Sequence, residues 1–486
     1  MRNIIKKVSP IAVAFLMLMG CSEDYLETMP TAQIAETEVL KTTQGAYVAL
    51  DGVYRYMFSS LTNHGNFGQK SQDLVMDLMG NDMVVHSAGY GWFNTDYQYT
   101  AQQSAASSSR SERAWEYYYS IIDNSNRILA AIDVAVGPQE DRDNIKGQAL
   151  ALRAHSYFYL INLFQHTYVG NESAPGVPLY TEPTTEGKPR GTVQEVYTQI
   201  LSDLKAAEAL LLPRTNKLHN SHINAKTVKG IWARVALQME DYATAAVKAN
   251  EARQGYTLMN AATYQAGFSK YNSEWMWGSI IGNDQATIYA SFFSHVDVSS
   301  GGYAALGTQK KITKELYDII PAGDVRKTVF RTPGTGTATY PDYTSIKFRL
   351  PVSGSWEGDY VLMRASEMYL IEAEALVRTG STTQAETVME TLGKARLATY
   401  DAPSEEEALL EEILLQRRIE LWGEGFSLLD IKRLNQGVNR TVGAGNHDAG
   451  LALAVTIPAE DPRFLYRIPQ DEINANDFID VSDQNP

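Results

Sequence analysis

Two stretches of the chain follow the same amino-acid pattern, and this repetition narrows the folds that are open to it. The segments are ARVALQMEDYATAAVKANEAR (233–253) and EAEALVRTGSTTQAETVMETL (372–392). Each predicts a helix, a short turn and a second helix, with small residues where the two helices meet. Equivalent positions hold the same residue type: Ala236 and Ala375, Leu237 and Leu376, Ala246 and Ala385. We therefore expect two closely packed helical hairpins.

This hairpin pattern is typical of tetratricopeptide-type repeats, in which each hairpin depends on its neighbours to cover its apolar face. Further helices are predicted by two adjacent apolar stripes over residues 145–163 and by a capping box at Thr192–Glu195. Ser404 is expected to cap another helix that reaches about Trp422. The predicted fold class is mainly α, with tetratricopeptide-like helical hairpins forming a scaffold.

Two regions depart from this helical pattern. Residues 80–110 and 255–360 are rich in Gly, Ser, Thr, Asn and aromatic residues. They predict a loop-rich irregular region with short β-strands, such as MWGSII (276–281) and SIKFRL (345–350). Trp275 and Trp277 alternate along the first of these strands, so one of them is expected to face the core. Long ordered loops are usually functional, which makes these regions the place to look for a binding site.

The N-terminus predicts export and lipid attachment. Basic residues are followed by the short apolar run IAVAFLMLMG (11–20) and then by Cys21, the only cysteine. At about 1.5 Å per residue the run covers only about half of a ~30 Å hydrocarbon core, so it fits a signal peptide better than a membrane span. A small residue before the cysteine resembles the bacterial lipobox. The resemblance implies a signal peptide over residues 1–20, acylation of Cys21 and a lipidated tether over 21–36; an ordinary signal peptide with an incidental cysteine is the alternative.

Charge excludes some classes of partner. The chain has 42 Lys and Arg against 57 Asp and Glu, a formal net charge of −15, and no basic cluster follows Lys7. Nucleic-acid binding depends on clustered cations, so no nucleic-acid partner is expected. The membrane is expected to be contacted through the N-terminal lipid only. The acidic segment SED (22–24) resembles an export signal to the cell surface.

Eight motifs follow one another along most of the chain. They are DYLETMPTAQI (24–34), TTQGAYVALDGVYRYM (42–57), IIDNSNRIL (121–129), GQALALRAHSYFYLINLF (147–164), VYTQILSDLKAAEALLLP (196–213), MRASEMYLIEAEALVRTG (363–380), ILLQRRIELWGEGFSLLDIKRLN (413–435) and YRIPQDEINAND (466–477). In this order they resemble the SusD/RagB family of outer-membrane nutrient-binding lipoproteins. The resemblance implies an N-terminal helical region with a ligand-loop insertion over 37–230. It also implies a C-terminal SusD/RagB region over 231–486, with the loop-rich segment 255–360.

The same resemblance implies a function. Members of this family sit on the cell surface, capture oligosaccharides or in some cases oligopeptides, and deliver them to a SusC-like TonB-dependent outer-membrane transporter. They are not enzymes, and no cofactor is implied. Several charged residues in the matching motifs are expected to form a structural acid–base lattice rather than a ligand site: Arg417, Arg418, Glu420, Asp430 and Arg433.

Ligand contacts are predicted from the loops. Sugars stack their C–H faces on exposed aromatic rings and hydrogen-bond their hydroxyl groups to polar side chains. The loop 78–97 offers Asn81 and Asp82, followed by three aromatic residues separated by glycine. The loop 289–307 surrounds a Gly-Gly turn with further rings, and Trp356 lies in a third loop. The predicted ligand-binding residues are Trp92, Asp82, Asn81, Tyr90, Phe93, Tyr303, Phe292 and Trp356, and the rings are expected to line one exposed surface patch.

Three other functions stay open at this stage. An oligopeptide ligand and a pure interaction scaffold are both compatible with helical hairpins. A surface glycoside hydrolase would need two carboxylates about 5–10 Å apart, and no catalytic pattern such as G-x-S-x-G supports an enzyme. His219 and His222 form an H-x-x-H without the register of a zinc motif, so no metal site is predicted.

Overall fold

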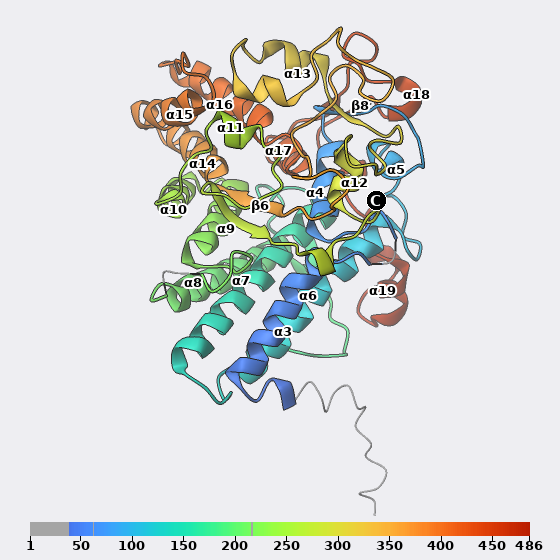
Figure 1. The fold of residues 1–486 in the computed structure, drawn as a ribbon. Coiled ribbons are helices and arrows are strands. Elements are labelled where there is room, and N and C mark those ends of the chain that lie inside the picture. Colours follow the sequence, from blue (N-terminus) through green and yellow to red (C-terminus); the bar gives the residue numbers. More distant parts are fainter. Residues whose placement is uncertain (1–37, 62, 215–216) are drawn as a thin grey trace, which may run out of the picture.

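A computed structural model describes residues 38–61, 63–214 and 217–486. The predicted signal peptide, Cys21 and the tether lie outside the described residues. The predicted mainly α fold class is confirmed (Figure 1). The longer helices are α3 (Thr43–Tyr56), α4 (Gln69–Leu78), α6 (Arg110–Ile132), α7 (Gln139–Phe164), α8 (Val193–Leu211), α9 (Ala225–Gln238), α10 (Tyr242–Arg253), α14 (Ala365–Arg378), α15 (Thr382–Arg396) and α16 (Glu406–Glu420).

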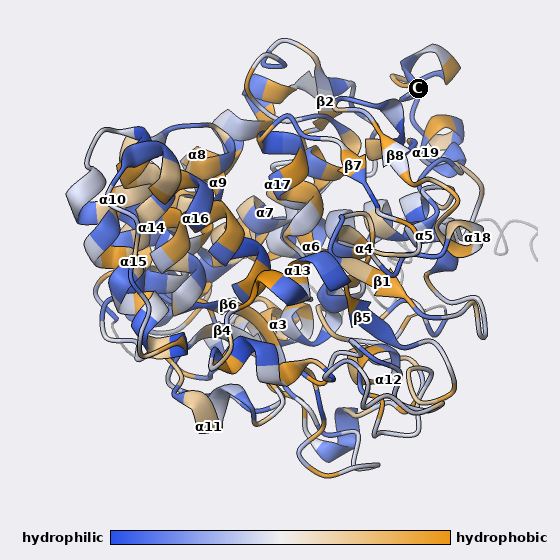
Figure 2. Cartoon of the chain, turned by 90° about the horizontal axis from the view of Figure 1, so that it is seen from above, coloured by the Kyte–Doolittle hydropathy of each residue, from blue (hydrophilic) through white to orange (hydrophobic). Residues whose placement is uncertain are grey.

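Shorter helices lie mostly in the irregular parts of the chain. They are α5 (Asn94–Tyr97), α11 (Ala261–Tyr264), α12 (Phe292–Val296), α13 (Lys314–Ile319), α17 (Ser427–Arg433), α18 (Ala449–Ala452) and α19 (Gln470–Ala475). Viewed from above, the hairpin helices α8, α9, α10, α14, α15 and α16 are grouped on one side of the molecule, and α5, α12 and α18 lie on the other (Figure 2). Over the described residues, no helix combines the length and the apolar character that crossing a bilayer requires.

The two predicted hairpins form and pack directly against each other. α9 with α10 is the first and α14 with α15 is the second, and α10 packs along α14. Both helices carry small buried residues: Ala245 and Ala249 of α10 and Ala373 and Ala375 of α14 are all fully buried. Without side-chain bulk, the helices approach closely and bury apolar surface on both sides of each hairpin. α6, α7, α8 and α9 continue the same stack, each against the next.

Local sequence accounts for where several of these helices begin. Thr192 accepts a hydrogen bond from the Glu195 backbone N–H through Oγ1 (3.2 Å), and Glu195 Oε2 accepts from the Thr192 N–H (2.7 Å), so the predicted capping box is confirmed. The predicted Ser404 cap is wrong. α16 begins at Glu406, and its N-cap residue Glu405 makes no side-chain capping bond. The carboxylates of the first turn still face the positive end of the helix dipole.

The short strands form four antiparallel pairs. β1 (Met83–Val85) pairs with β5 (Lys310–Ile312), and β2 (Pro175–Pro178) pairs with β3 (Arg190–Thr192). β4 (Trp275–Ser279) pairs with β6 (Tyr360–Arg364), and β7 (Val438–Asn439) pairs with β8 (Thr456–Ile457). The predicted strand at 276–281 is therefore confirmed in its first part. The strand predicted at 345–350 is wrong, because only an isolated bridge at Ser345 forms there.

Trp275 and Trp277 correct a second expectation, because both are fully buried. The β4–β6 register shifts between them, which breaks the simple alternation of faces. Trp277 Nε1 donates to the backbone oxygen of Ser221 (2.8 Å), and its ring meets His155 edge-on. Both faces of this ribbon are covered by other parts of the chain.

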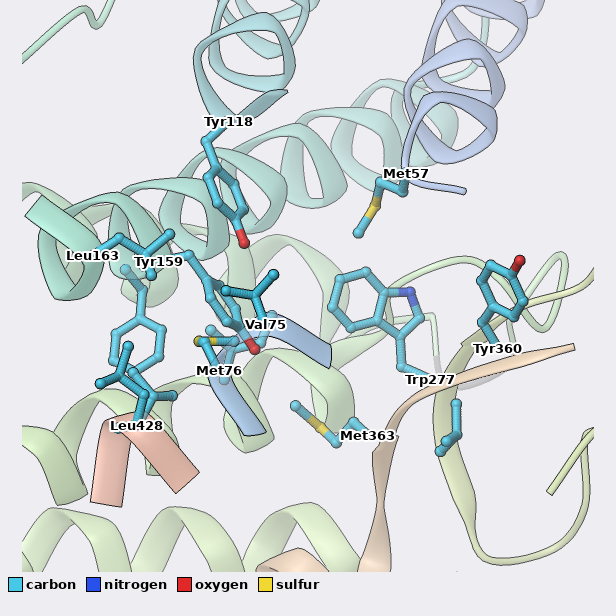
Figure 3. Packing of buried hydrophobic residues seen from close by; sticks show 14 of the residues in the cluster. Met57, Val75, Met76, Tyr118, Tyr159, Leu163, Trp277, Tyr360, Met363 and Leu428 are labelled. Atoms are coloured by element: carbon cyan, nitrogen blue, oxygen red, sulfur yellow. The ribbon is translucent and has the colours of Figure 1, made fainter. Parts of the chain in front are cut away.

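One apolar core joins the two halves of the chain. Figure 3 shows Tyr118 of α6 and Tyr159 of α7 near Val75 of α4, together with Trp277 of β4 and Met363 of β6. These residues are far apart in the sequence and are all buried. The loop-rich region is therefore packed onto the helical scaffold, which gives its surface loops a rigid base.

A buried network of charged residues fixes the end of α16. Glu420 accepts hydrogen bonds from Arg364 Nη1 (2.5 Å) and Arg396 Nη2 (2.9 Å). Glu424 accepts from Arg364 Nε (2.8 Å) and Lys347 Nζ (2.6 Å). The predicted structural lattice also forms around Asp430, which accepts from Arg417 and Arg433; Arg418 instead pairs with Asp82. Buried charges of this kind are costly to leave unpaired, so each member depends on the others.

We expect Glu424→Gln to destabilise the protein at neutral pH. Burial raises the pKa of Glu424, but Arg364 and Lys347 outweigh burial and hold this pKa at about 2, below its usual 4.5. A shift of this size corresponds to about 3 kcal/mol in the free energy of unfolding. The contribution is fully present above pH 4.5 and is lost as the pH falls toward 2, so the difference between wild type and variant should shrink in that window.

Urea unfolding followed by circular dichroism at pH 7, 5 and 3 tests this expectation. Glu407→Gln, an exposed change in the first turn of the same helix, is the control and should alter the unfolding free energy by less than about 1 kcal/mol. An equal difference between wild type and Glu424→Gln at pH 7 and pH 3 would contradict the assigned pKa.

Candidate ligand-binding site

The β1–β5 ribbon brings the two predicted ligand loops together. Val85, the last residue of β1, pairs with Lys310, the first residue of β5. The chain therefore leaves β1 and enters β5 at the same end of the ribbon. The loops continue side by side, because the His86 N–H donates to the Gln309 oxygen (3.0 Å) and Ser87 Oγ donates to the Gly307 oxygen (2.6 Å). Residues 86–93 and 286–309 thus form one surface.

Five rings meet on this surface, and we call them the aromatic cluster. Its members are His64, Tyr90, Trp92, Tyr289 and Tyr303. Tyr303 lies at the centre: its ring centroid is 5.3 Å from that of Tyr90, 5.5 Å from Tyr289, 5.9 Å from Trp92 and 5.9 Å from His64. These separations are within the range of favourable aromatic contacts. The Tyr303 hydroxyl and His64 Nδ1 share a hydrogen bond of 2.7 Å.

The outer members of the aromatic cluster are open to solvent, whereas its centre is not. Tyr90 is 64% exposed and Tyr289 is 42% exposed. His64 is also exposed, Trp92 is half-buried, and Tyr303 is only 8% exposed. The side chains combine apolar ring faces with hydroxyl, indole and imidazole groups at their edges. Such a surface can stack on a flat apolar face and hydrogen-bond to the polar groups around it.

A buried layer supports the aromatic cluster from below. His295 stacks on Tyr303 with the ring centroids 5.1 Å apart, and Phe93 and Phe67 pack against His295. Burial, followed by the nearby charge of Lys310, lowers the pKa of His295 to about 3. His295 is therefore neutral at neutral pH, and its Nε2 lies 2.8 Å from the His64 backbone oxygen. The layer holds the rings in place without adding charge beneath them.

Two predicted ring contacts are corrected by this arrangement. Phe93 and Phe292 are only 3% and 2% exposed, so neither presents an open ring face. Phe93 has a left-handed backbone with φ 65°, and its ring packs inside against Phe67 and His295. Phe292 begins α12 and packs edge-on against Phe348 and Tyr360. Both side chains support the loops from inside.

The other predicted contacts lie away from the aromatic cluster. Asp82 accepts hydrogen bonds from Arg418 Nη2 (2.7 Å) and Nε (2.9 Å). Asn81 Oδ1 accepts from the Asn439 N–H (2.8 Å). Both residues line a separate cavity beside α16 and α17. Trp356 is half-buried against the core, and the described ring contacts do not connect it to the cluster. Of the predicted set, the structure therefore brings together Tyr90, Trp92 and Tyr303.

Sequence reasoning missed two members of the aromatic cluster. Tyr289 is the first residue of the predicted loop 289–307, and its neighbours Ile288 and Ala290 give no local signal that its ring is exposed. His64 follows α3 in the segment NHGN (63–66) and likewise carries no such signal. Only the tertiary fold brings it to Tyr303, which is 239 residues further along the chain.

A groove elsewhere on the molecule differs from the aromatic cluster in the residues that line it. This groove of about 630 Å³ lies between α6, residues 180–187 and α19, and it is lined by several carboxylates, including Glu116, Glu182 and Glu472. Its tyrosine and tryptophan residues are buried or half-buried. The aromatic cluster, with the exposed rings of Tyr90 and Tyr289, is therefore the better surface for a ligand to stack on. Across the described parts of the chain, no group of three or more His, Cys, Asp or Glu is arranged to hold a metal ion.

Helical hairpins that carry such a ring-bearing loop surface define a class of scaffolded binding proteins. A family model described as starch-binding and associating with the outer membrane matches residues 25–237, and a model described as the SusD family matches 350–486. A SusD-like carbohydrate-binding protein from Bacteroides vulgatus is 30% identical, with 92% of this chain and 98% of that chain covered and a TM-score of 0.81. The chain therefore belongs to the SusD family.

Two further comparisons agree with this assignment. SusD-like protein P38 of Formosa agariphila is 24% identical over 518 residues, which cover 89% of this chain and 93% of that relative. A laminarin-binding SusD-like protein shares the fold with a TM-score of 0.69 at 22% identity, with 92% of this chain and 99% of that chain covered.

We expect Tyr303 to hold the aromatic cluster together mainly through its ring. Tyr303→Ala should lower the free energy of unfolding by about 3 kcal/mol, because it leaves a cavity among several rings. Tyr303→Phe keeps the ring and removes only the hydrogen bond to His64, so it should cost about 1 kcal/mol. Denaturant unfolding of the two variants measures both values. Equal losses for the two variants would show that the hydroxyl, and not the ring, is the important group.

Proposed function

We propose that this protein binds an oligosaccharide at the aromatic cluster on the cell surface and delivers it to a SusC-like TonB-dependent outer-membrane transporter. The observation that carries the proposal is the set of exposed and half-exposed rings around Tyr303. Pyranose rings have flat C–H faces bordered by hydroxyl groups. Rings of Tyr90, Trp92 and Tyr289 complement such faces, and the polar edges of these side chains complement the hydroxyl groups.

An uncharged glycan fits this surface better than a polyanionic one. None of the five members of the aromatic cluster is a lysine or arginine that could pair with an anionic group of a glycan. The chain as a whole has a net charge of −15, which repels anionic polysaccharides at long range. The sequence identity to a carbohydrate-binding relative supports the same class of ligand.

Binding without cleavage is part of the proposal. Glycoside hydrolysis canonically uses two carboxyl groups that flank the scissile bond. None of the five members of the aromatic cluster is an acid, and the nearby carboxylate of Asp96 is buried in an ion pair with Arg110. A sugar that lies on the cluster would therefore meet rings and hydroxyl groups rather than a general acid and a nucleophile.

The position of the aromatic cluster suits a surface receptor that is anchored through its N-terminus. In Figure 1 the described chain begins with α3 at the lower end of the molecule, whereas α5 and α12, which adjoin the two ligand loops, lie in the upper half. The described chain therefore starts away from the elements that adjoin the ligand loops, and this separation supports capture of a ligand by a protein that is anchored through its N-terminus.

We expect Trp92→Ala to reduce affinity for the bound oligosaccharide by about tenfold, since one stacking face is lost. Isothermal titration calorimetry with a panel of neutral laminari-, malto-, cello- and xylo-oligosaccharides identifies the ligand and measures the change. Phe478→Ala removes an exposed aromatic ring outside the cluster and serves as the control. A loss for Trp92→Ala below about threefold would remove Trp92 from the site. Binding of oligopeptides in place of every glycan would overturn the ligand class.

Replacement of Cys21 by serine should release the protein from the membrane fraction. Serine cannot form the thioether on which acylation depends, and two or more acyl chains give stable anchoring. Fractionation of cells that produce wild type or Cys21→Ser, with protease accessibility of intact cells as a second measurement, tests anchoring and surface exposure separately. Ser22→Ala is the control and should stay with the membrane. Unchanged membrane association of Cys21→Ser would contradict lipid anchoring at this residue.

A further inference from the structure

The cavity lined by Asn81 and Asp82 lies at the junction of α16 and α17, apart from the aromatic cluster and from the groove at α6. It has a volume of about 350 Å³, at the lower end of the range for ligand pockets. Its walls come from the last turns of α16, the segment that joins α16 to α17, α17 itself, α13 and the residues before β1. Figure 1 shows α13, α16 and α17 together in the upper half of the molecule. The cavity shares no lining residue with the aromatic cluster.

The cavity combines a polar and charged lining with an apolar wall of leucine and aromatic residues. Leu414 and Leu415 are half-buried on α16, and Leu434 is half-buried just after α17. Leu421, Trp422 and Phe426 complete this surface from the connecting segment. The leucine side chains offer no flat ring face, and the rings of Trp422 and Phe426 are buried, so this wall complements an apolar side chain better than a sugar. The cavity is large enough to receive one or two such side chains.

One buried cation in this cavity has unused hydrogen-bonding capacity. Arg417 is 5% exposed, and its Nε donates to Asp430 Oδ2 (2.7 Å). Its Nη1 atom is also buried and has no hydrogen-bond partner among the described residues. An unmatched donor on a buried guanidinium is costly, because the group has lost its water. A ligand that carries an oxygen acceptor into the cavity would remove that cost.

The charges at the rim indicate which kind of ligand fits. Arg418 is already paired with Asp82, and Asp430 is already paired with Arg417 and Arg433. The remaining charged groups that line the cavity are Glu315 and Glu411, which are exposed and form no salt bridge with described residues. An acidic ligand would be repelled here, and a cationic group next to an apolar one would be attracted.

We propose that this cavity binds a peptide segment of another protein in which Lys or Arg is next to an apolar residue. The apolar side chain enters between Leu414, Leu415 and Leu421. A backbone carbonyl of the segment accepts the hydrogen bond that Arg417 Nη1 can donate. The cationic side chain lies beside Glu315 and Glu411. This site is independent of the oligosaccharide-binding function proposed for the aromatic cluster.

Three capped peptides test the proposal on the full chain: acetyl-Arg-Leu-Leu-amide, acetyl-Glu-Leu-Leu-amide and acetyl-Arg-Ser-Ser-amide. Titration calorimetry or ligand-observed NMR measures their affinities. The first peptide should bind about tenfold more tightly than either of the others, since it alone has both the charge and the apolar side chains. Equal affinities for the three peptides, or no binding of the first at millimolar concentration, would overturn the proposal.

Variants assign the binding to the cavity. Arg417→Lys keeps a cation beside Asp430 but removes the guanidinium donor, and it should weaken the first peptide by about tenfold. The double variant Glu315→Gln/Glu411→Gln should remove the preference for arginine over glutamate. Glu407→Gln, an exposed change on α16 outside the cavity, and Trp92→Ala, in the aromatic cluster, should leave peptide binding unchanged.

Circular dichroism of each variant separates loss of binding from loss of fold. If Arg417→Lys does not fold, Leu415→Ser, at a half-buried wall position, provides the second measurement and should also weaken the first peptide. Full retention of binding in a folded Arg417→Lys or Leu415→Ser protein would place the peptide elsewhere. Loss of peptide binding in Trp92→Ala would assign it to the aromatic cluster and likewise overturn the proposal.

Discussion

The packing of α10 against α14 is the constraint on which the rest of this structure depends. These helices come from hairpins that flank the whole loop-rich region, and their contact brings the two ends of that region together. Just beyond the hairpin contact, β4 pairs with β6. The loop-rich residues between these two strands therefore leave the scaffold and return to it at the same ribbon. The loops are therefore presented on a rigid support, which limits the entropy that is lost when a ligand binds.

A few tertiary contacts join this loop-rich region to the N-terminal loop 78–97 and form a defined surface. The β1–β5 ribbon places segments from both halves of the chain next to each other. Tyr303 then serves as a central ring, and His295 supports it as a buried neutral imidazole. The outer rings stay exposed because the buried layer below them is already filled. Apolar surface left open to water in this way costs stability, and such patches usually mark a binding site.

The charged interior has a different role from the binding surfaces. Glu420 and Glu424 connect the end of α16 to β6 and α15 through three or more buried cations, so the loop region and the second hairpin are held in one arrangement. The same end of α16 lines the cavity between α16 and α17. There Arg417 Nε donates to Asp430, and Arg417 Nη1 has no hydrogen-bond partner among the described residues. Arg417, which the sequence predicts to be structural, therefore also lines the proposed peptide site. The charged residues of the motif 413–435 mainly form ion pairs that stabilise the fold. Binding at this motif would use the donors that these ion pairs do not engage, such as Arg417 Nη1.

The sequence by itself determined the scaffold, because helical periodicity, capping residues and small-residue contacts are local signals. The alanines of the two hairpins and the capping box at Thr192 identified their helices correctly. It also located the two loops that form the aromatic cluster, with Trp92, Tyr90 and Tyr303 among the residues chosen. Only the tertiary structure decided which rings are exposed. The backbone of Phe93 and the packing of Phe292 turn those rings inward, Asp82 is taken by Arg418, and His64 arrives from a distant segment. Side-chain exposure depends on contacts between segments far apart in the chain, and residue type and spacing do not encode those contacts locally.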